Sequence, residues 1–170
     1  MKIVVVGTRG IPDIQGGVET HCEELYPRLA AMGHDVTVVR RSCYVTPQNK
    51  IKEYKGVHLK DIYAPRRKSI EAIVHTFLAI IYARWVGADV LHIHAIGPAL
   101  LTPLARLLGL RVVMTHHGPD YDRQKWNKTA KSVLRWGERM GTNYANEVIV
   151  ISTVIDNISV SYTHLTLPTI

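Results

Sequence analysis

Residues 2–21 read KIVVVGTRGIPDIQGGVETH, and this stretch decides the fold of the chain. Residues 3–6 form a β-branched run, which predicts a strand buried on both faces of a parallel sheet. Residues that permit tight turns follow it in the loop: Gly10, Pro12, Gly16 and Gly17. A helix is predicted from about Val18. This order of strand, glycine-rich loop and helix predicts an anion-binding site, because backbone N–H groups are exposed at the positive end of a helix.

The glycine spacing differs from the dinucleotide fingerprint G-x-G-x-x-G, because Gly7 and Gly10 are followed by a glycine pair several residues further on. The acidic residue that would hold a ribose after the second strand is also missing, since residues 36–39 run into Arg40 and Arg41. NAD is therefore disfavoured. NADP remains a candidate ligand, because an arginine at that place can bind a 2′-phosphate. A further alternative is that the glycines have a purely structural role, in a tight connection between the strand and the helix.

The composition predicts one soluble globular domain with anionic partners. The chain has 170 residues, of which 46% are hydrophobic and 21% charged, and a formal net charge of +7. The basic residues are dispersed and no nucleic-acid-binding motif is present, so we expect no nucleic acid. Cys22 and Cys43 have no metal-ligand spacing, and no secretory leader precedes the first strand, so we expect reduced thiols and a cytoplasmic location.

Alternating helices and strands are predicted along the whole chain. The expected strands after the first are 36–39, 57–62, 89–95, 111–115 and 147–151, and the helices are 18–32, 70–85 with Ser69 as N-cap, 97–108 and 128–146. The last helix is expected to bury the stripe Val133, Trp136, Met140 and Tyr144. This alternation predicts the α/β class, a Rossmann-like open parallel sheet with helices on both faces.

Histidines at two strand ends are the candidate chemical groups. His92 and His94 lie two residues apart and face the same side of a strand, but no third ligand lies nearby at a metal-like spacing, so we expect no metal. His116 and His117 follow the strand 111–115 at the edge where open α/β sheets place their ligands. A histidine there can donate to a sugar hydroxyl or a phosphate oxygen, or can be satisfied by the backbone of its own loop.

Arg66, Arg67 and Lys68 precede the helix 70–85, whose dipole they oppose. Their position indicates an anionic partner, such as anionic lipid or the diphosphate of a lipid-linked acceptor. The alternative is a solvated loop.

Three segments resemble the amino-terminal half of retaining glycosyltransferases of family 4, which have the two-domain GT-B architecture. They are GTRGIPDIQGGVETH at 7–21, VVMTHHGPDYDRQKW at 112–126 and RWGERMGTNYANEVIVIS at 135–152. The resemblance covers residues 2 to about 158. Within the family, this sequence is similar to the bacterial rhamnosyltransferase-like subgroup.

The resemblance implies transfer of a sugar, with rhamnose as the candidate, from a nucleotide-diphosphate sugar to a polysaccharide or lipid-linked acceptor. It implies retention at the anomeric carbon and neither a metal nor another cofactor. Gly16 and Gly17 would lie against the donor diphosphate, and His117 would be the catalytic residue that contacts the donor sugar. The candidate acceptor- or anion-binding residues are Arg66, Arg67, Lys68, His94 and Asp120.

We expect residues 1–158 to form the acceptor-side domain, one half of a GT-B architecture. Residues 159–170, SVSYTHLTLPTI, resemble a translated sequencing adapter and are expected to be a non-native or disordered tail. The family's donor-binding domain is then a missing partner, and the chain alone is expected to be inactive. The inner face of the membrane is a second candidate location. A free-standing nucleotide- or phosphate-binding module and an NADP-dependent oxidoreductase are the alternative functions.

Overall fold

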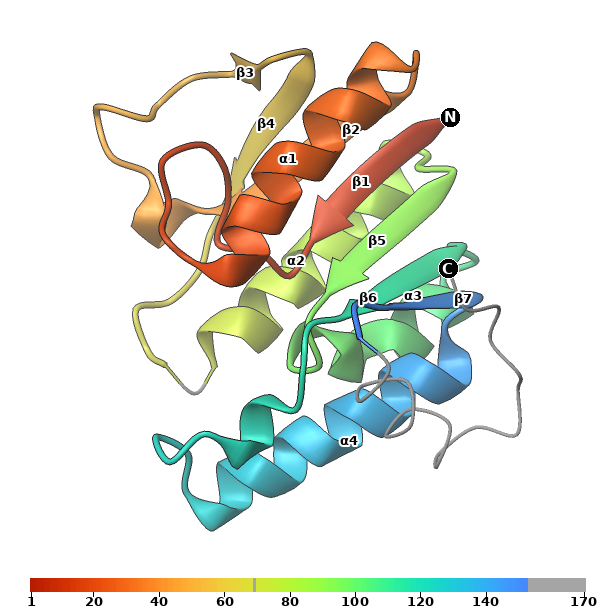
Figure 1. Cartoon of the computed structure of the whole chain (residues 1–170). Helices are drawn as coiled ribbons and strands as arrows, with labels where there is room; N and C mark the ends of the chain where they lie inside the picture. Colours follow the sequence, from red (N-terminus) through yellow and green to blue (C-terminus); the bar gives the residue numbers. More distant parts are fainter. Residues whose placement is uncertain (69, 153–170) are drawn as a thin grey trace.

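The computed structural model describes residues 1–68 and 70–152, which form a sheet covered by helices (Figure 1). The strands are β1 (Lys2–Val6), β2 (Asp35–Arg41), β3 (Glu53–Tyr54), β4 (Val57–Ile62), β5 (Val90–His94), β6 (Val112–His116) and β7 (Glu147–Val150). The helices are α1 (Gly17–Ala31), α2 (Glu71–Trp85), α3 (Thr102–Leu107) and α4 (Lys128–Tyr144), with short 3₁₀ turns η1 (Ser42–Tyr44), η2 (Pro98–Leu101) and η3 (Asp120–Asp122). The expected N-cap Ser69 and the expected tail 159–170 lie outside the described residues.

The described strands form a seven-stranded sheet in the order β3-β4-β2-β1-β5-β6-β7. Every neighbouring pair is parallel except β3 and β4, which form an antiparallel pair. The chain builds outward from β1 to one side, through β2 and β4, and then returns to build β5, β6 and β7 on the other. The topological switch point therefore lies between β1 and β5, where sheets of this kind bind their ligands.

The predicted Rossmann-like class and the six predicted strands are confirmed. The additional strand β3 has two residues, too few to show the alternation by which a strand is recognised. The helix expected at 97–108 is divided into η2 and α3 at Pro103, which has no N–H to continue a helix from the preceding turn.

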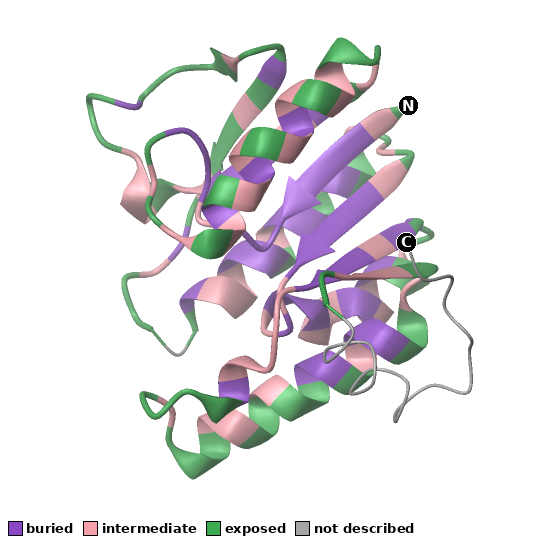
Figure 2. Ribbon diagram, viewed as in Figure 1, coloured by how far each residue is buried: buried purple, intermediate pink, exposed green. Residues whose placement is uncertain are grey.

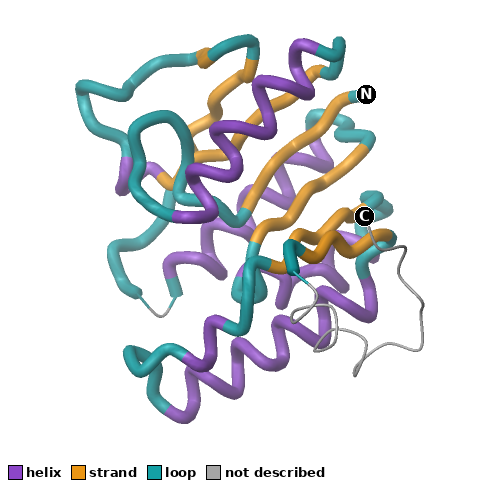
Figure 3. The backbone as a smooth tube through the Cα atoms, in the orientation of Figure 1, coloured by secondary structure: helices purple, strands orange, loops and turns teal. Residues whose placement is uncertain are grey.

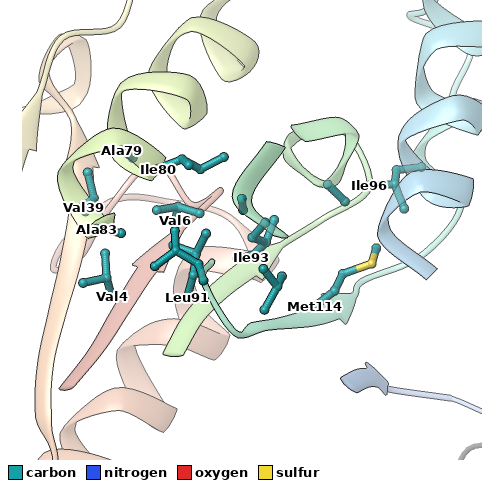
Figure 4. Close-up of a cluster of buried hydrophobic side chains, with 14 of the residues drawn as sticks. Val4, Val6, Val39, Ala79, Ile80, Ala83, Leu91, Ile93, Ile96 and Met114 are labelled. Atoms are coloured by element: carbon teal, nitrogen blue, oxygen red, sulfur yellow. The ribbon is translucent and has the colours of Figure 1, made fainter. Parts of the chain in front are cut away.

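Helices cover both faces of the sheet, as predicted, and alternate side chains of β1 point to the two faces. Ile3 and Val5 pack against Cys22 and Tyr26 of α1, in one core cluster. The opposite face of β1 packs against α2 in a second cluster, which continues through β5 and β6 to η2 (Figure 4). Figure 2 shows the consequence: β1 and β5 at the centre are buried along nearly their whole length.

Helix α4 packs on the second cluster through glycines. A Cβ added at Gly137 would lie 2.0 Å from the carbonyl oxygen of Ile96, and one at Gly141 would lie 2.4 Å from the sulfur of Met114. The predicted buried stripe of this helix is therefore wrong: Val133, Trp136 and Tyr144 are exposed, Met140 is half-buried, and the buried positions are Gly137, Glu138, Gly141 and Thr142. The physical reason is the close backbone approach, which only residues without a side chain allow.

None of the helices in the described part of the chain has both the length and the apolar character needed for a membrane span.

Candidate functional site

The candidate site lies at the switch point, where the loops after β1, β5 and β6 leave the same edge of the sheet (Figures 1 and 3). Gly7 ends β1 with a φ of 94°, and a Cβ there would lie 2.2 Å from the carbonyl oxygen of His94. Only glycine allows the two backbones to pass this closely. The approach places the end of β5, with its histidines, directly beside the start of the glycine-rich loop.

The glycine-rich loop is held by Glu19, which lies in the first turn of α1 and is 5% exposed. The Oε1 atom of Glu19 accepts hydrogen bonds from the backbone N–H of Arg9 (2.9 Å) and the hydroxyl of Thr8 (3.2 Å). The Thr8 hydroxyl oxygen in turn accepts the N–H of Gly10 at 3.1 Å. Glu19 is not among the site residues predicted from the sequence. The available signal was an acidic residue three positions after Gly16, in the first turn of the predicted helix.

The two predicted diphosphate-binding glycines differ in their surroundings. Gly16 is the N-cap of α1, with no side-chain cap, and a Cβ there would lie 1.9 Å from a carboxylate oxygen of Glu19. At Gly17 a Cβ would meet nothing within 4 Å. The guanidinium of Arg9 lies over the Tyr44 ring and donates to the carbonyl of Gln15, 3.0 Å away. An open helix N-terminus beside an arginine favours an anionic ligand.

Arg40 and Arg41, the residues that kept NADP open, are both engaged within the fold. The fully buried Arg40 forms an ion pair with Asp61 at 2.6 Å and donates to the carbonyl of Asn49 at 2.7 Å. Arg41 pairs with Glu71 at 2.7 Å and also donates to the carbonyl of Gly7. Neither guanidinium can reach a 2′-phosphate without breaking a buried ion pair, so the arginines no longer favour NADP.

A chain of side-chain hydrogen bonds crosses the α1 face of the sheet. His92 bonds through Nε2 to the hydroxyl of Thr115 (2.7 Å) and through Nδ1 to the hydroxyl of Tyr26 (2.8 Å). The same hydroxyl of Tyr26 bonds to Nε2 of His94, and Nδ1 of His94 bonds to Nε2 of His117 at 2.8 Å. His94 is fully buried and both of its ring nitrogens form hydrogen bonds. A ligand can therefore contact this series of hydrogen-bonded side chains only through the half-buried His117.

His21 of α1 completes this group of rings. Its ring centroid lies 5.1 Å from that of His117 and 5.7 Å from that of His94. Neither His21 nor Tyr26 is among the site residues predicted from the sequence, because no spacing along the chain indicates that α1 lies over β5. The contact exists only after the sheet has formed.

Burial keeps the rings of this group neutral. Desolvation, followed by repulsion from neighbouring histidines, lowers the pKa of His117 to about 4 and that of His92 to about 3. Desolvation also lowers the pKa of His21, and that of His94 lies well below its ordinary value for the same reason. At pH 7 these rings act as neutral donors and acceptors of hydrogen bonds.

His116 faces the opposite side of the sheet from His117, as expected for consecutive residues of an extended segment. It is fully buried, its Nε2 lies 2.6 Å from a carboxyl oxygen of Glu138, and its Nδ1 accepts the N–H of Gly118 at 3.0 Å. His116 therefore joins α4 to β6 and is closed to ligands.

The three predicted cations lie apart from this group, and the predicted Asp120 is paired within its own loop. Arg66, Arg67 and Lys68 are exposed after β4, which is separated from β5 by β2 and β1. Asp120 begins η3 and pairs with the exposed Arg123 at 3.0 Å. The start of α1, His94 and His117 thus lie together at one site. The three cations follow β4, and two strands lie between β4 and β5.

Comparison with known proteins supports this fold. The family model described as Glycosyltransferase Family 4 matches residues 15–163. A structure of sucrose-phosphate synthase from Thermosynechococcus elongatus aligns with 95% of this chain at a TM-score of 0.71 and 19% identity. This chain covers 45% of that structure, less than half of its length. A second structure of the same synthase aligns with 92% of this chain, and with 79% of its own, at a TM-score of 0.62 and 19% identity. The comparison with curated protein sequences gives no match.

Proposed function

The chain belongs to glycosyltransferase family 4, and we propose that it binds the diphosphate of a nucleotide sugar at the start of α1 and orients the sugar through His117. The observation that carries this proposal is the open space at Gly17, beside a helix N-terminus, in a site that also holds the half-buried His117. In this proposal the domain takes part in transfer of a sugar to an acceptor.

The diphosphate would be held by the first turn of α1. The first N–H groups of a helix have no acceptor inside the helix, and the helix dipole places about half a positive charge there. Arg9 adds a full positive charge at the same place, on the loop that Glu19 fixes. As the bond between the sugar and the diphosphate breaks, negative charge grows on the leaving phosphate. Donors already in position stabilise that charge more than they stabilise the bound substrate, which lowers the barrier.

His117 would contact the donor sugar. Because its Nε2 is engaged by His94, its Nδ1 is the ring atom that would meet a sugar hydroxyl. The neutral ring forms this hydrogen bond without adding a charge beside the reacting carbon. His94, fixed in turn by Tyr26, would set the orientation of the His117 ring.

The stereochemistry, the donor and the acceptor of the reaction are proposed from the resemblance to the family. We propose retention at the anomeric carbon, no metal in the transfer step, and removal of the acceptor proton by the leaving diphosphate. The donor sugar is proposed to be rhamnose and the acceptor a polysaccharide or a lipid-linked glycan, with Arg66, Arg67 and Lys68 at an anionic acceptor or membrane surface. Transfer would also require the family's donor-binding domain, because a donor held from one side stays solvated and poorly oriented.

Calorimetric titration tests the diphosphate site. Gly17→Val places a branched side chain in the open space where the diphosphate would lie, and the affinity for a nucleoside diphosphate should fall below detection. Glu24→Val is the matched control, because it puts the same side chain two helical turns further on, at an exposed position, and should bind as the wild type does. Unchanged affinity of Gly17→Val would contradict the proposed site.

The ligand preference separates the alternative functions. Binding of nucleotide sugars without binding of NADP supports the glycosyltransferase. Equal weak binding of every nucleotide would indicate a phosphate-binding module, and preference for NADP an oxidoreductase. In the chain joined to a family donor-binding domain, His117→Ala should lower turnover by roughly two to four orders of magnitude. Loss of less than a factor of ten would refute its role.

A further inference from the structure

Three histidines from three separate elements converge beside the glycine-rich loop. His21 comes from α1, His94 ends β5, and His117 follows β6. One ring nitrogen of each lies within 4.8 Å of those of the other two. We propose that these three imidazoles form a binding site for Zn²⁺ in which a fourth coordination position stays open to solvent.

The separations of the ring nitrogens suit a zinc ion after a small adjustment. Zn–N bonds of 2.0–2.1 Å in a tetrahedral arrangement place two ligand nitrogens about 3.3 Å apart. Nδ1 of His94 and Nε2 of His117 now lie 2.8 Å apart, so the two rings must separate by a few tenths of an ångström. His117 lies on a loop and His21 near the start of a helix, and both are half-buried, so these two rings can move while His94 stays fixed.

The buried hydrogen-bond chain supplies the support that a zinc-bound histidine needs. A histidine that binds a metal through Nδ1 carries its proton on Nε2 and donates it to a partner behind the ring. For His94 that partner is the hydroxyl of Tyr26, which can then donate its own proton to Nδ1 of His92. His92 completes the sequence by donating from Nε2 to the hydroxyl of Thr115. The donors of His94, Tyr26 and His92 then each have an acceptor, and Nδ1 of His94 is left with a lone pair for the metal.

The chemistry of the cluster selects the kind of cation. Three neutral imidazoles suit Zn²⁺ and other late first-row transition metals, whereas Mg²⁺ and Ca²⁺ prefer oxygen ligands. Three protein ligands and an open position are typical of zinc sites that bind water or an anion as the fourth ligand. The transfer reaction proposed above uses no metal, so zinc binding is a separate property of these residues and can fail or hold independently of it.

Zinc titration of the untagged full chain tests the proposal. After treatment with a chelator, calorimetry with ZnCl2 should show one equivalent of binding, and MgCl2 should show none. His21→Ala removes one ligand from a half-buried position, so the fold should persist by circular dichroism while zinc affinity falls at least about tenfold. Co²⁺ in place of Zn²⁺ should give the intense visible absorption of a low-coordinate site in the wild type and not in His21→Ala.

His58→Ala is the matched control. His58 is exposed and lies 3.8 Å from a carboxylate oxygen of Asp35 and 4.0 Å from one of Glu53, so it is the natural competitor for an added cation. Its loss should leave the stoichiometric site unchanged. The proposal is overturned if the wild type binds no stoichiometric zinc, if His21→Ala binds zinc as the wild type does, or if His58→Ala abolishes the binding.

Discussion

Two adjacent histidines should have opposite roles, and a stability measurement can separate them. His116→Ala is expected to destabilise the fold severely, because His116 is fully buried and its ring bonds to Oε1 of the buried Glu138 carboxyl group. His117→Ala removes a half-buried ring with one bond to His94 and should leave the fold nearly intact.

The magnitudes follow from what each variant leaves behind. Oε2 of Glu138 already has no hydrogen-bond partner among the described residues, so losing His116 leaves the whole carboxyl group buried without one. Breaking a buried pair in this way costs about 3–5 kcal/mol, a large share of the 5–15 kcal/mol that stabilises a typical domain. The loss of one hydrogen bond at His117 costs about 1 kcal/mol.

Urea unfolding, followed by tryptophan fluorescence, gives both values. Replacing the pair together, as in His116→Leu with Glu138→Leu, should recover most of the stability, because two apolar side chains leave no buried polar group unpaired. A double variant as unstable as the single one would contradict this account. So would equal losses of stability in His116→Ala and His117→Ala.

Three further predictions concern packing, pH and charge. Gly137→Ala should lower the free energy of unfolding, measured in urea, by about 1–3 kcal/mol, because the clash with the carbonyl of Ile96 outweighs a helix-propensity gain of about 1 kcal/mol. A variant more stable than the wild type would disprove the close approach. Burial lowers the pKa of His75 to about 4 and that of His92 to about 3 in the folded protein. Below pH 6.5 the unfolded state therefore binds more protons than the folded state, and the urea midpoint should fall steadily towards pH 4. A midpoint that does not change with pH would refute this. Replacing Arg66, Arg67 and Lys68 by serine should weaken sedimentation with anionic vesicles at low salt, each charge contributing about 1 kcal/mol, and an unchanged bound fraction would show a solvated loop.

The sequence predicts most of this fold because its strands and helices are strongly patterned. Residues 3–6, buried on both faces, read as a continuous apolar run, and the other strands follow turn residues at regular intervals. The buried face of α4 escaped prediction for a definite reason. Hydrophobic periodicity detects large side chains, whereas α4 packs through Gly137 and Gly141, where the backbone itself makes the contact.

The candidate site was predictable only where local geometry decides it. Alternation along an extended segment separated His116 from His117, and the turn chemistry of the loop placed Gly16 and Gly17 at a helix start. His21 could not be found in this way. Its partners are more than seventy residues away along the chain, and they meet it only through the order of strands in the sheet.

The buried Arg40 has a consequence for the thermodynamics of ligand binding. Its side chain lies directly against Gly10, its guanidinium reaches the carbonyl of Ile11, and the N–H of the next residue, Arg41, donates to the carbonyl of Arg9. The glycine-rich loop thus acquires its order when the domain folds. An anion that binds there immobilises little additional chain, so its binding should carry a small entropic penalty. For the same reason, the amide hydrogen of Gly10 should exchange with solvent deuterium only when the whole domain unfolds.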